Sequence, residues 1–327
     1  MCKLSVKTVS LLAFFVTALC GPVVVLAQTY PTKPIKLIVP FPPGGALDSV
    51  ARAMVDPLKE RLGQPVIIDN RPGAGARLAT EVVVRSPGDG YTILITTPAS
   101  TTVAPALIPN LSYSPTIDLI PITRVSEIVN VMLVPEGRNI KTVQEFINWA
   151  KGKKGEILFG TSGAGSADHL AGEFFKQITN LPMEAIHYKG GGPAMIDLAA
   201  ERLDVSFATY AAASSVLQSG KIRAIAVTTP KRQGMLPSLP TIGETVKDFG
   251  VSNWAGIFVP KNTPQAIVDR LFKEFVAVSN LPEVRKRQNL AGLEISLSAS
   301  TEEFSSSLKL ETTRWNKIIK EANIKVE

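Results

Sequence analysis

Residues 35–45 read IKLIVPFPPGG and contain the first strand-to-helix junction of the chain. The run 35–39 is short and apolar, as expected of a strand buried in a sheet. Prolines stiffen the loop that follows, and Gly44 and Gly45 allow backbone N–H groups to approach a ligand. Apolar residues then recur at helical spacing up to Gly63, which is a good helix stop.

The same alternation continues through the first third of the chain. Strands are predicted at 65–68 and 92–95, with a helix at 78–85 between them. This β-α-β-α-β rhythm favours a largely parallel sheet with helices on both faces, which is an α/β fold.

A second block repeats this rhythm. Thr142 followed by Glu145 is typical of a helix N-terminus. The further predicted elements are strands at 157–159, 183–187, 205–207 and 222–227 and helices at 170–178 and 193–200. Two blocks of one class predict two lobes, each with its own core.

The C-terminal part is mostly helical, with helices predicted to begin at Thr263 and Ser300. A helical tail cannot form a core alone, so we expect it to pack back on the first lobe. The chain would then cross between the lobes twice, along 122–134 and 251–259, and two such crossings make a hinge. The predicted lobes are 28–127 with 255–327, and 128–254.

Residues 1–27 are predicted to be a secretory signal peptide. A positive start with Lys3 and Lys7 precedes an apolar run, and cleavage is predicted after Ala27. The mature protein would then enter the periplasm. Lipidation at Cys20 is an alternative, although the preceding leucine fits such a site poorly.

Composition and charge exclude several classes of function. The net charge of +7 comes from scattered Lys and Arg residues, and export argues against nucleic acid as a partner. Both cysteines lie within the predicted signal, and two histidines with no mature cysteine disfavour a zinc site. No later segment approaches the ~20 apolar residues of a membrane span. We expect no cofactor, and we expect the protein to be a monomer.

In an open parallel sheet, ligands bind beyond the carboxyl ends of the strands. The loops after the first two strands are therefore candidate ligand contacts. Their candidate residues are Phe41, Pro43, Gly44, Gly45, Asp48 and Gly75. For Asp48, the N-cap of the following helix is favoured over a ligand contact.

The loop 160–166, GTSGAGS, is the best candidate anion site. Free N–H groups at a helix start, the positive end of the helix dipole and three hydroxyl groups would converge there. The loop lacks the lysine and the spacing of a nucleotide-binding P-loop, so it suits a carboxylate. Its candidate contacts are Thr161, Ser162, Gly165 and Ser166.

Two further loops are weaker candidates. The loop 96–101 contributes Thr97 and Ser100, and the loop 187–193 contributes Tyr188, Lys189 and Gly190. Lys189 can be solvated instead, and Tyr188 can pack inside its lobe.

These loops together resemble the tripartite tricarboxylate transporter receptor family, the Bug-type solute-binding proteins. The resemblance covers essentially all of the mature chain. It rests on Val39-Pro40-Phe41-Pro42-Pro43-Gly44-Gly45, Asn70-Arg71-Pro72-Gly73-Ala74-Gly75, Asp89-Gly90-Tyr91-Thr92, Ser162-Gly163, Gly165-Ser166, His169-Leu170-Ala171-Gly172-Glu173, Tyr188-Lys189-Gly190-Gly191 and Asp204-Val205.

The resemblance implies a two-lobe periplasmic binding protein of type II, the Venus-flytrap fold, with two hinge strands. It also implies capture of a small carboxylate ligand for the integral membrane subunits of a transporter. His169 and Asp204 join the site candidates on this ground. The chain departs from the family pattern at Arg77 and at Asp168. Arg77 either adds a positive charge near the cleft or points outward. Asp168 either interacts favourably with the helix dipole or faces the pocket and repels an anion.

Two rival functions use the same residues. A secreted serine hydrolase would need Ser162 or Ser166 paired with His169 or His187, but Ala164 interrupts the nucleophile-elbow pattern. A receptor that presents its ligand to a membrane signalling protein would have the same site as a transport receptor. The sequence therefore favours a binding protein and leaves its membrane partner open.

Overall fold

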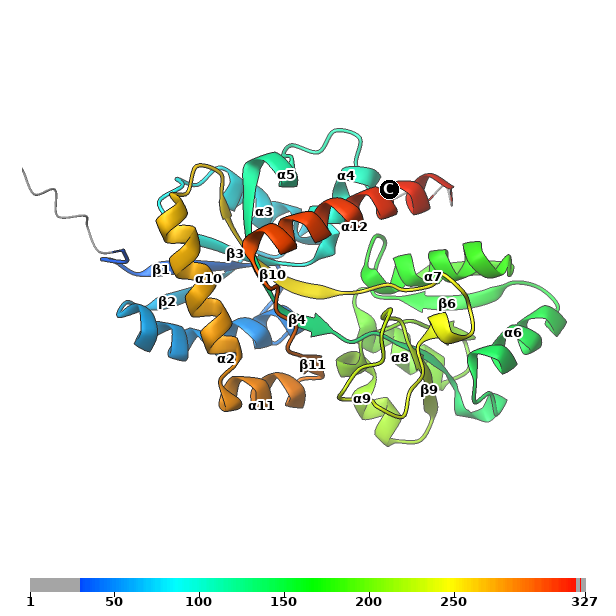
Figure 1. Ribbon diagram of the computed structural model, residues 1–327. Helices are drawn as coiled ribbons and strands as arrows, with labels where there is room; N and C mark the ends of the chain where they lie inside the picture. Colours follow the sequence, from blue (N-terminus) through cyan, green and yellow to red (C-terminus); the bar gives the residue numbers. More distant parts are fainter. Residues whose placement is uncertain (1–29, 322–323, 325–327) are drawn as a thin grey trace, which may run out of the picture.

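The computed structural model describes residues 30–321 and 324. They form two lobes that lie side by side (Figure 1). Lobe 1 is the half built on a six-stranded sheet, and lobe 2 is the half built on a five-stranded sheet. The predicted signal peptide, with both cysteines, lies outside the described residues. The predicted two-lobe α/β fold is confirmed.

The sheet of lobe 1 has the strand order β11-β4-β10-β3-β1-β2. β1 pairs in parallel with β2 and β3, whereas β10 runs antiparallel between β3 and β4. The carboxyl ends of β1, β2 and β3 therefore meet at one edge. The strands are β1 (Ile35–Val39), β2 (Val66–Asn70), β3 (Thr92–Thr96), β4 (Leu119–Ile128), β10 (Trp254–Pro260) and β11 (Leu293–Glu294).

Helices cover both faces of this sheet because its buried strands alternate their side chains. Leu37 and Val39 join the core under α2 and α10, whereas Ile38 faces α3 and α12. The helices are α2 (Ala46–Leu62), α3 (Arg77–Val84), α4 (Ala104–Leu107), α5 (Pro115–Asp118), α10 (Gln265–Ser279), α11 (Pro282–Leu290) and α12 (Thr301–Glu321), with the short turns η2 (Ala74–Ala76) and η3 (Ala99–Val103).

Lobe 2 repeats the same plan with the strand order β7-β6-β8-β5-β9. β6 lies in parallel between β7 and β8, so their carboxyl ends again share an edge. Its elements are β5 (Val131–Pro135), η4 (Glu136–Arg138), α6 (Val143–Gly152), β6 (Ile157–Thr161), α7 (Ala167–Thr179), β7 (Met183–His187), α8 (Gly191–Ala199), β8 (Val205–Ser206), α9 (Tyr210–Gln218), β9 (Ile222–Val227) and η5 (Ile242–Glu244). The Thr142 hydroxyl caps α6 by accepting from the Glu145 N–H at 3.1 Å.

The chain passes between the lobes twice. β4 ends at Ile128 in the first sheet and β5 begins at Val131 in the second, and the return path enters β10 at Trp254 (Figure 1). The exact division at 127/128 and 254/255 stays a prediction. Two short connections of this kind allow the lobes to move as rigid bodies about a hinge.

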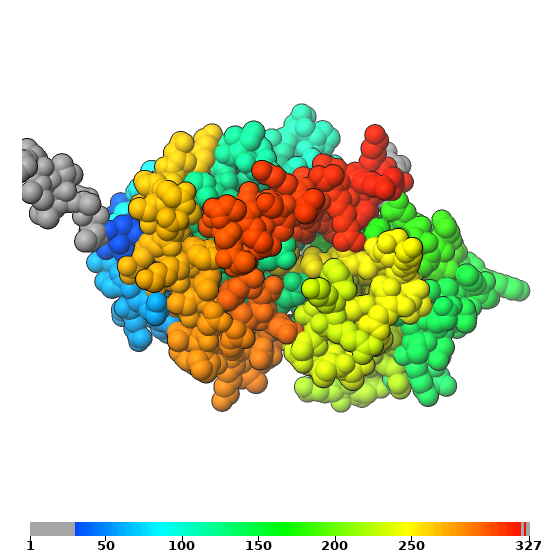
Figure 2. Space-filling view, in the orientation of Figure 1, coloured from blue at the N-terminus to red at the C-terminus, as the bar shows by residue number. Residues whose placement is uncertain are grey.

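The last helix differs from the expectation that it packs on the first lobe alone. Its first half does so, since Phe304 and Leu308 lie in the core of lobe 1. Its last turns join, through Trp315, Ile318 and Ile319, an apolar cluster that includes Val103 of lobe 1 and much of the core of lobe 2. Figure 2 shows this helix extending from lobe 1 over to the surface of lobe 2. A helix of 21 residues is about 32 Å long, which is enough to span the join.

Candidate functional site

The candidate site is a cavity between the lobes of about 680 Å³. Its walls come from loops at the carboxyl ends of both sheets, from the two crossings and from α12. Parallel sheets place ligands at such edges, and pockets for small ligands range over roughly 300–1,000 Å³. The cavity is therefore suited in position and size to hold a small molecule.

The structure brings some of the predicted site residues together and leaves others outside. Those on the cavity wall are Phe41, Gly45, Gly75, Thr97, Ser162, Gly165 and Ser166, together with Arg77 and Asp168. The predicted contacts that do not line it are Pro43, Gly44, Asp48, Ser100, Thr161, His169, Tyr188, Lys189, Gly190 and Asp204. Most of the second group nevertheless supports the loops of the first.

Asp48 lies behind the first loop and holds its shape. The carboxylate accepts hydrogen bonds from the Gly44 N–H at 2.9 Å, the Asn70 amide at 3.1 Å and the Arg52 guanidinium at 2.7 Å. Burial alone would raise the pKa of Asp48, but these three donors and the charge of Arg52 lower it. Asp48 is not the N-cap, which is Gly45. Its carboxylate reaches back from the first turn instead.

Asp168 occupies the matching place behind the lobe 2 loop. Its carboxylate accepts from the Ser162 N–H at 2.6 Å and from the Ser162 hydroxyl at 2.9 Å. Burial raises the pKa of Asp168, against the opposing hydrogen bonds from Ser166 and Ser162. No Lys, Arg or His side chain in the described part of the chain forms an ion pair with it. Asp168 thus both lines the cavity and organises the loop.

Of the donors expected from the sequence, the backbone N–H groups are left for a ligand and the serine hydroxyls are not. The Ser162 hydroxyl is engaged by Asp168, and the Ser166 hydroxyl donates to the Gly163 carbonyl while capping α7. Among the described residues, the N–H groups of Ala164 and Ala167 have no hydrogen-bond partner. Both residues line the cavity at the positive end of the α7 dipole. The donors that this loop offers to the cavity are therefore backbone rather than hydroxyl groups.

Two histidines and a threonine support this loop from behind. The His169 Nδ1 accepts from the Gly165 N–H at 3.0 Å, and the Thr161 hydroxyl lies 2.7 Å from the His187 Nδ1. The two imidazole rings meet edge to face at 4.7 Å. Burial, and then the positive potential of His187 and Lys176, lowers the pKa of His169 to about 4. His169 is therefore neutral near pH 7 and serves the loop as an acceptor.

The loop 187–193 supports the site but contributes little of the cavity surface. The Gly190 N–H donates to the Ser162 carbonyl at 3.2 Å, which joins the two loops. The Tyr188 hydroxyl turns away to Asp197 at 2.7 Å, and Lys189 is exposed. The adjacent Gly191 lines the cavity.

Asp204 lies at the other end of the sheet from the cavity. It precedes β8, whereas the cavity lies beyond the carboxyl ends of the strands. Its carboxylate accepts from the Leu158 N–H at 2.7 Å and pairs with Arg138 at 2.6 Å and with Lys153. These contacts make Asp204 a structural residue of lobe 2.

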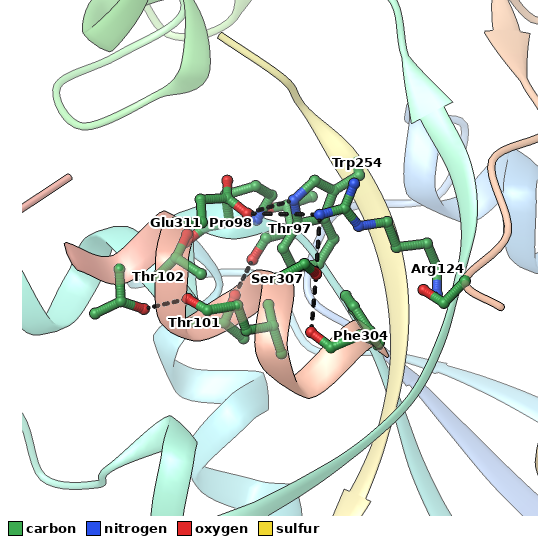
Figure 3. Close-up of polar contacts among 12 residues, drawn as sticks. Thr97, Pro98, Thr101, Thr102, Arg124, Trp254, Phe304, Ser307 and Glu311 are labelled. Atoms are coloured by element: carbon green, nitrogen blue, oxygen red, sulfur yellow. Dashed lines mark hydrogen bonds and ion pairs between the residues drawn. The ribbon is translucent and has the colours of Figure 1, made fainter. Parts of the chain in front are cut away.

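The part of the cavity wall that lies at the hinge was not predicted from the sequence. Asn130, Ser252 and Asn253 line it from the crossings. Next to these residues, the partly buried Glu311 of α12 accepts from the Trp254 indole at 2.9 Å and lies 4.0 Å from Arg124 (Figure 3). Burial raises the pKa of Glu311, opposed by Trp254 and Arg124. This network fastens α12 to both hinge strands.

The arrangement does not support the hydrolase alternative. Neither Ser162 nor Ser166 forms a hydrogen bond with an imidazole ring among the described residues. The Ser162 hydroxyl contacts Asp168, and the Ser166 hydroxyl contacts the Gly163 carbonyl and the His169 backbone N–H. Within residues 30–321 no three His, Cys, Asp or Glu side chains are placed to share a metal ion. In that same range no helix combines the length and apolar character needed to cross a bilayer.

Comparisons with known proteins agree with this architecture. The structure matches that of the periplasmic binding protein BugD with a TM-score of 0.76 and 31% identity, covering 91% of this chain and 100% of that one. It also matches R. palustris Rpa4515 with adipate, with a TM-score of 0.79 and 32% identity over 90% of this chain and 99% of that one. Protein BugT of Bordetella pertussis (strain Tohama I) is 35% identical over 246 residues, 75% of this chain and 76% of the relative.

The family assignment follows from the sequence match. Residues 50–324 fit the model of the family described as tripartite tricarboxylate transporter family receptor. This range includes loops of both lobes that line the cavity, both crossings and the whole of α12. The chain belongs to the tripartite tricarboxylate transporter receptor family.

Proposed function

We propose that the protein is a periplasmic receptor that closes its two lobes on a small carboxylate-bearing solute. The observation that carries this proposal is the pair of unpartnered N–H groups, of Ala164 and Ala167, at the start of α7 on the wall of the interlobe cavity. Oriented N–H groups at a helix N-terminus favour a carboxylate. The adipate in the related Rpa4515 structure is a solute of this class.

The same architecture supports a mechanism of capture. The solute first contacts one lobe, and rotation about the crossings brings the second set of loops onto it. Closure removes water from the cavity, which strengthens each hydrogen bond to the carboxylate. We propose that the closed form is what integral membrane transporter subunits recognise, with no chemical change to the solute.

The proposal includes the predicted processing and state of the chain. Cleavage after Ala27 would release residues 28–327 into the periplasm, where the receptor acts as a monomer. Delivery to a transporter is favoured over delivery to a signalling protein because the chain belongs to a family of transporter receptors. A pull-down with each candidate membrane partner, with and without solute, separates the two deliveries.

A thermal-shift screen of residues 28–327 tests the binding. The panel holds mono-, di- and tricarboxylates, amino acids and aromatic acids, each beside its amide. A solute at a hundred times its Kd should stabilise the fold by about 2.7 kcal/mol. We expect stabilisation by at least one acid and none by its amide. Equal stabilisation by acid and amide, or binding of neutral or cationic compounds alone, would refute the carboxylate receptor.

A further inference from the structure

One side of the cavity is apolar. Val103 and Leu107 contribute to it from lobe 1, Leu170 and Val251 from lobe 2, and Trp315 from α12. All five also belong to, or pack against, one contiguous hydrophobic cluster. Val103, Leu170, Val251 and Trp315 are almost fully buried behind this part of the wall, and the half-buried Leu107 is the most exposed of the five. We call these five residues the apolar chamber.

The chamber lies next to the proposed carboxylate site. Leu170 follows Ala167 by three residues on α7, so the two are separated by less than one helical turn of about 5.4 Å. A carboxylate held by the Ala164 and Ala167 N–H groups would therefore have its carbon skeleton beside Leu170. From there the surface continues to Leu107 and Trp315.

Charged groups are scarce on the rest of the wall. Among the described residues that line the cavity, Arg77 carries a positive charge and Asp168 a negative one. The Arg77 guanidinium already donates to the Ala74 carbonyl at 2.8 Å. A tricarboxylate would bring two or three negative charges to a wall with one cation, and charges removed from water without partners are costly. The wall is better matched to a solute with few charges.

We propose that the solute is a carboxylic acid with an apolar body, either an aliphatic chain or an aromatic ring, that fills the apolar chamber. This inference rests on the proposed function of the same site. Burial of apolar surface against Leu170, Leu107 and Trp315 supplies the affinity, and the carboxylate supplies the orientation. Short polar acids such as malate and citrate are then poor solutes.

Calorimetric titration of residues 28–327 with a graded series tests this choice. The series runs from butanoate to octanoate, with benzoate and adipate beside malate and citrate. Each methylene that enters the chamber should tighten binding by about fourfold until the chamber is filled. Tighter binding of malate or citrate than of octanoate or benzoate would overturn the apolar solute and leave the carboxylate receptor standing. If no acid binds, both proposals fall.

A matched pair of variants locates the effect. Leu107→Asn puts a polar group into the chamber at a half-buried position, and Leu310→Asn makes the same change on α12 at a leucine that is 74% exposed and outside the cavity. We expect Leu107→Asn to weaken octanoate at least tenfold and butanoate little, and Leu310→Asn to change neither. Should Leu107→Asn fail to fold, Leu107→Ala applies the same test with a smaller loss. Unchanged octanoate affinity in a folded Leu107 variant would overturn the chamber.

Discussion

The β1–α2 junction of lobe 1 and the β6–α7 junction of lobe 2 use the same construction with different charge. In each, a carboxylate in the first helical turn reaches back to a backbone N–H of the preceding loop. Asp48 does so with Arg52 and Asn70 as further partners, whereas Asp168 has serine donors. The pKa of the first is lowered and that of the second is raised. The surroundings of Asp48 thus favour its ionised form, and those of Asp168 disfavour its ionised form.

This difference assigns the two lobes different tasks. The lobe 1 loop is electrically balanced and presents Phe41 and Gly45 to the cavity. The lobe 2 loop presents free N–H groups and has beside them a buried carboxyl group, Asp168, whose ionised form burial disfavours. Binding of an acid there brings two carboxylates together, and a shared site of this kind favours uptake of a proton.

The largest expected effect is loss of the lobe 1 carboxylate. Asp48→Ala leaves the Gly44 N–H and the Asn70 amide without their partner, and each unsatisfied donor costs about 1–3 kcal/mol. We expect the free energy of unfolding in urea to fall by about 4 kcal/mol. Asp56→Ala, at an exposed position of the same helix, is the control and should change it little. Equal effects of the two substitutions would contradict the role of Asp48 in stabilising the β1–α2 junction.

Acidification should affect the lobe 2 junction through His169. Its folded pKa of about 4 lies below the ordinary 6.5, so the unfolded chain binds more protons between these values. The neutral His169 therefore contributes about 3 kcal/mol to the free energy of unfolding above pH 6.5, and this contribution is lost as the pH falls to 4. Urea titrations at several pH values should show a flatter pH dependence for His169→Gln than for the wild type. His187→Gln should keep most of the slope, and a slope unchanged in His169→Gln would contradict the assignment.

Neutralising the lobe 2 carboxylate should have the opposite sign to neutralising its lobe 1 counterpart. Asp168→Asn keeps an acceptor for the Ser162 N–H and removes a buried charge, so the free energy of unfolding at pH 7 should rise by about 1 kcal/mol. The gain should shrink as the pH falls toward the ordinary pKa of 3.8. Asp48→Asn, measured in parallel, should lower the stability. If both substitutions changed the free energy of unfolding in the same direction, the proposed difference between the two carboxylates would be wrong.

The smallest expected effect concerns the affinity for acids. Protonation of Asp168 removes a negative charge beside the site, so the affinity of the wild type for an acid should rise a few-fold as the pH falls toward the raised pKa of Asp168. Asp168→Asn should bind more tightly at pH 7 and lose this dependence. Calorimetry in buffers of different ionisation enthalpy would detect the proton that the wild type takes up. Identical pH profiles for wild type and variant would exclude coupling through Asp168.

The sequence was sufficient to predict the layout of the site because the layout depends on chain order. Glycine-rich loops between strands and helices mark the carboxyl ends of parallel strands, and Gly45, Gly75 and Ser162 do line the cavity. Side-chain direction was not predictable in the same way. Nothing in the order of residues states that the Ser162 hydroxyl turns to Asp168, or that Tyr188 turns to Asp197.

The apolar part of the site was missed for a related reason. Leu107, Leu170 and Trp315 lie on three different helices, α4, α7 and α12, and apolar helix residues ordinarily indicate a core. Leu170 and Trp315 do belong to a core cluster, and Leu107 packs against it. Their second role as cavity wall depends on how α12 spans the two lobes, which is a long-range contact without a local pattern. Asp204 was placed in the site by resemblance, although its position before a strand indicated the opposite edge of the sheet.

A crystal structure of residues 28–327 with the tightest-binding acid tests the central claim most directly. We expect its carboxylate oxygens to lie about 2.7–3.2 Å from the backbone nitrogens of Ala164 and Ala167, and its carbon skeleton to contact Leu107 and Leu170. A carboxylate paired with Arg77 instead, with the start of α7 left empty and the apolar chamber unfilled, would contradict the account.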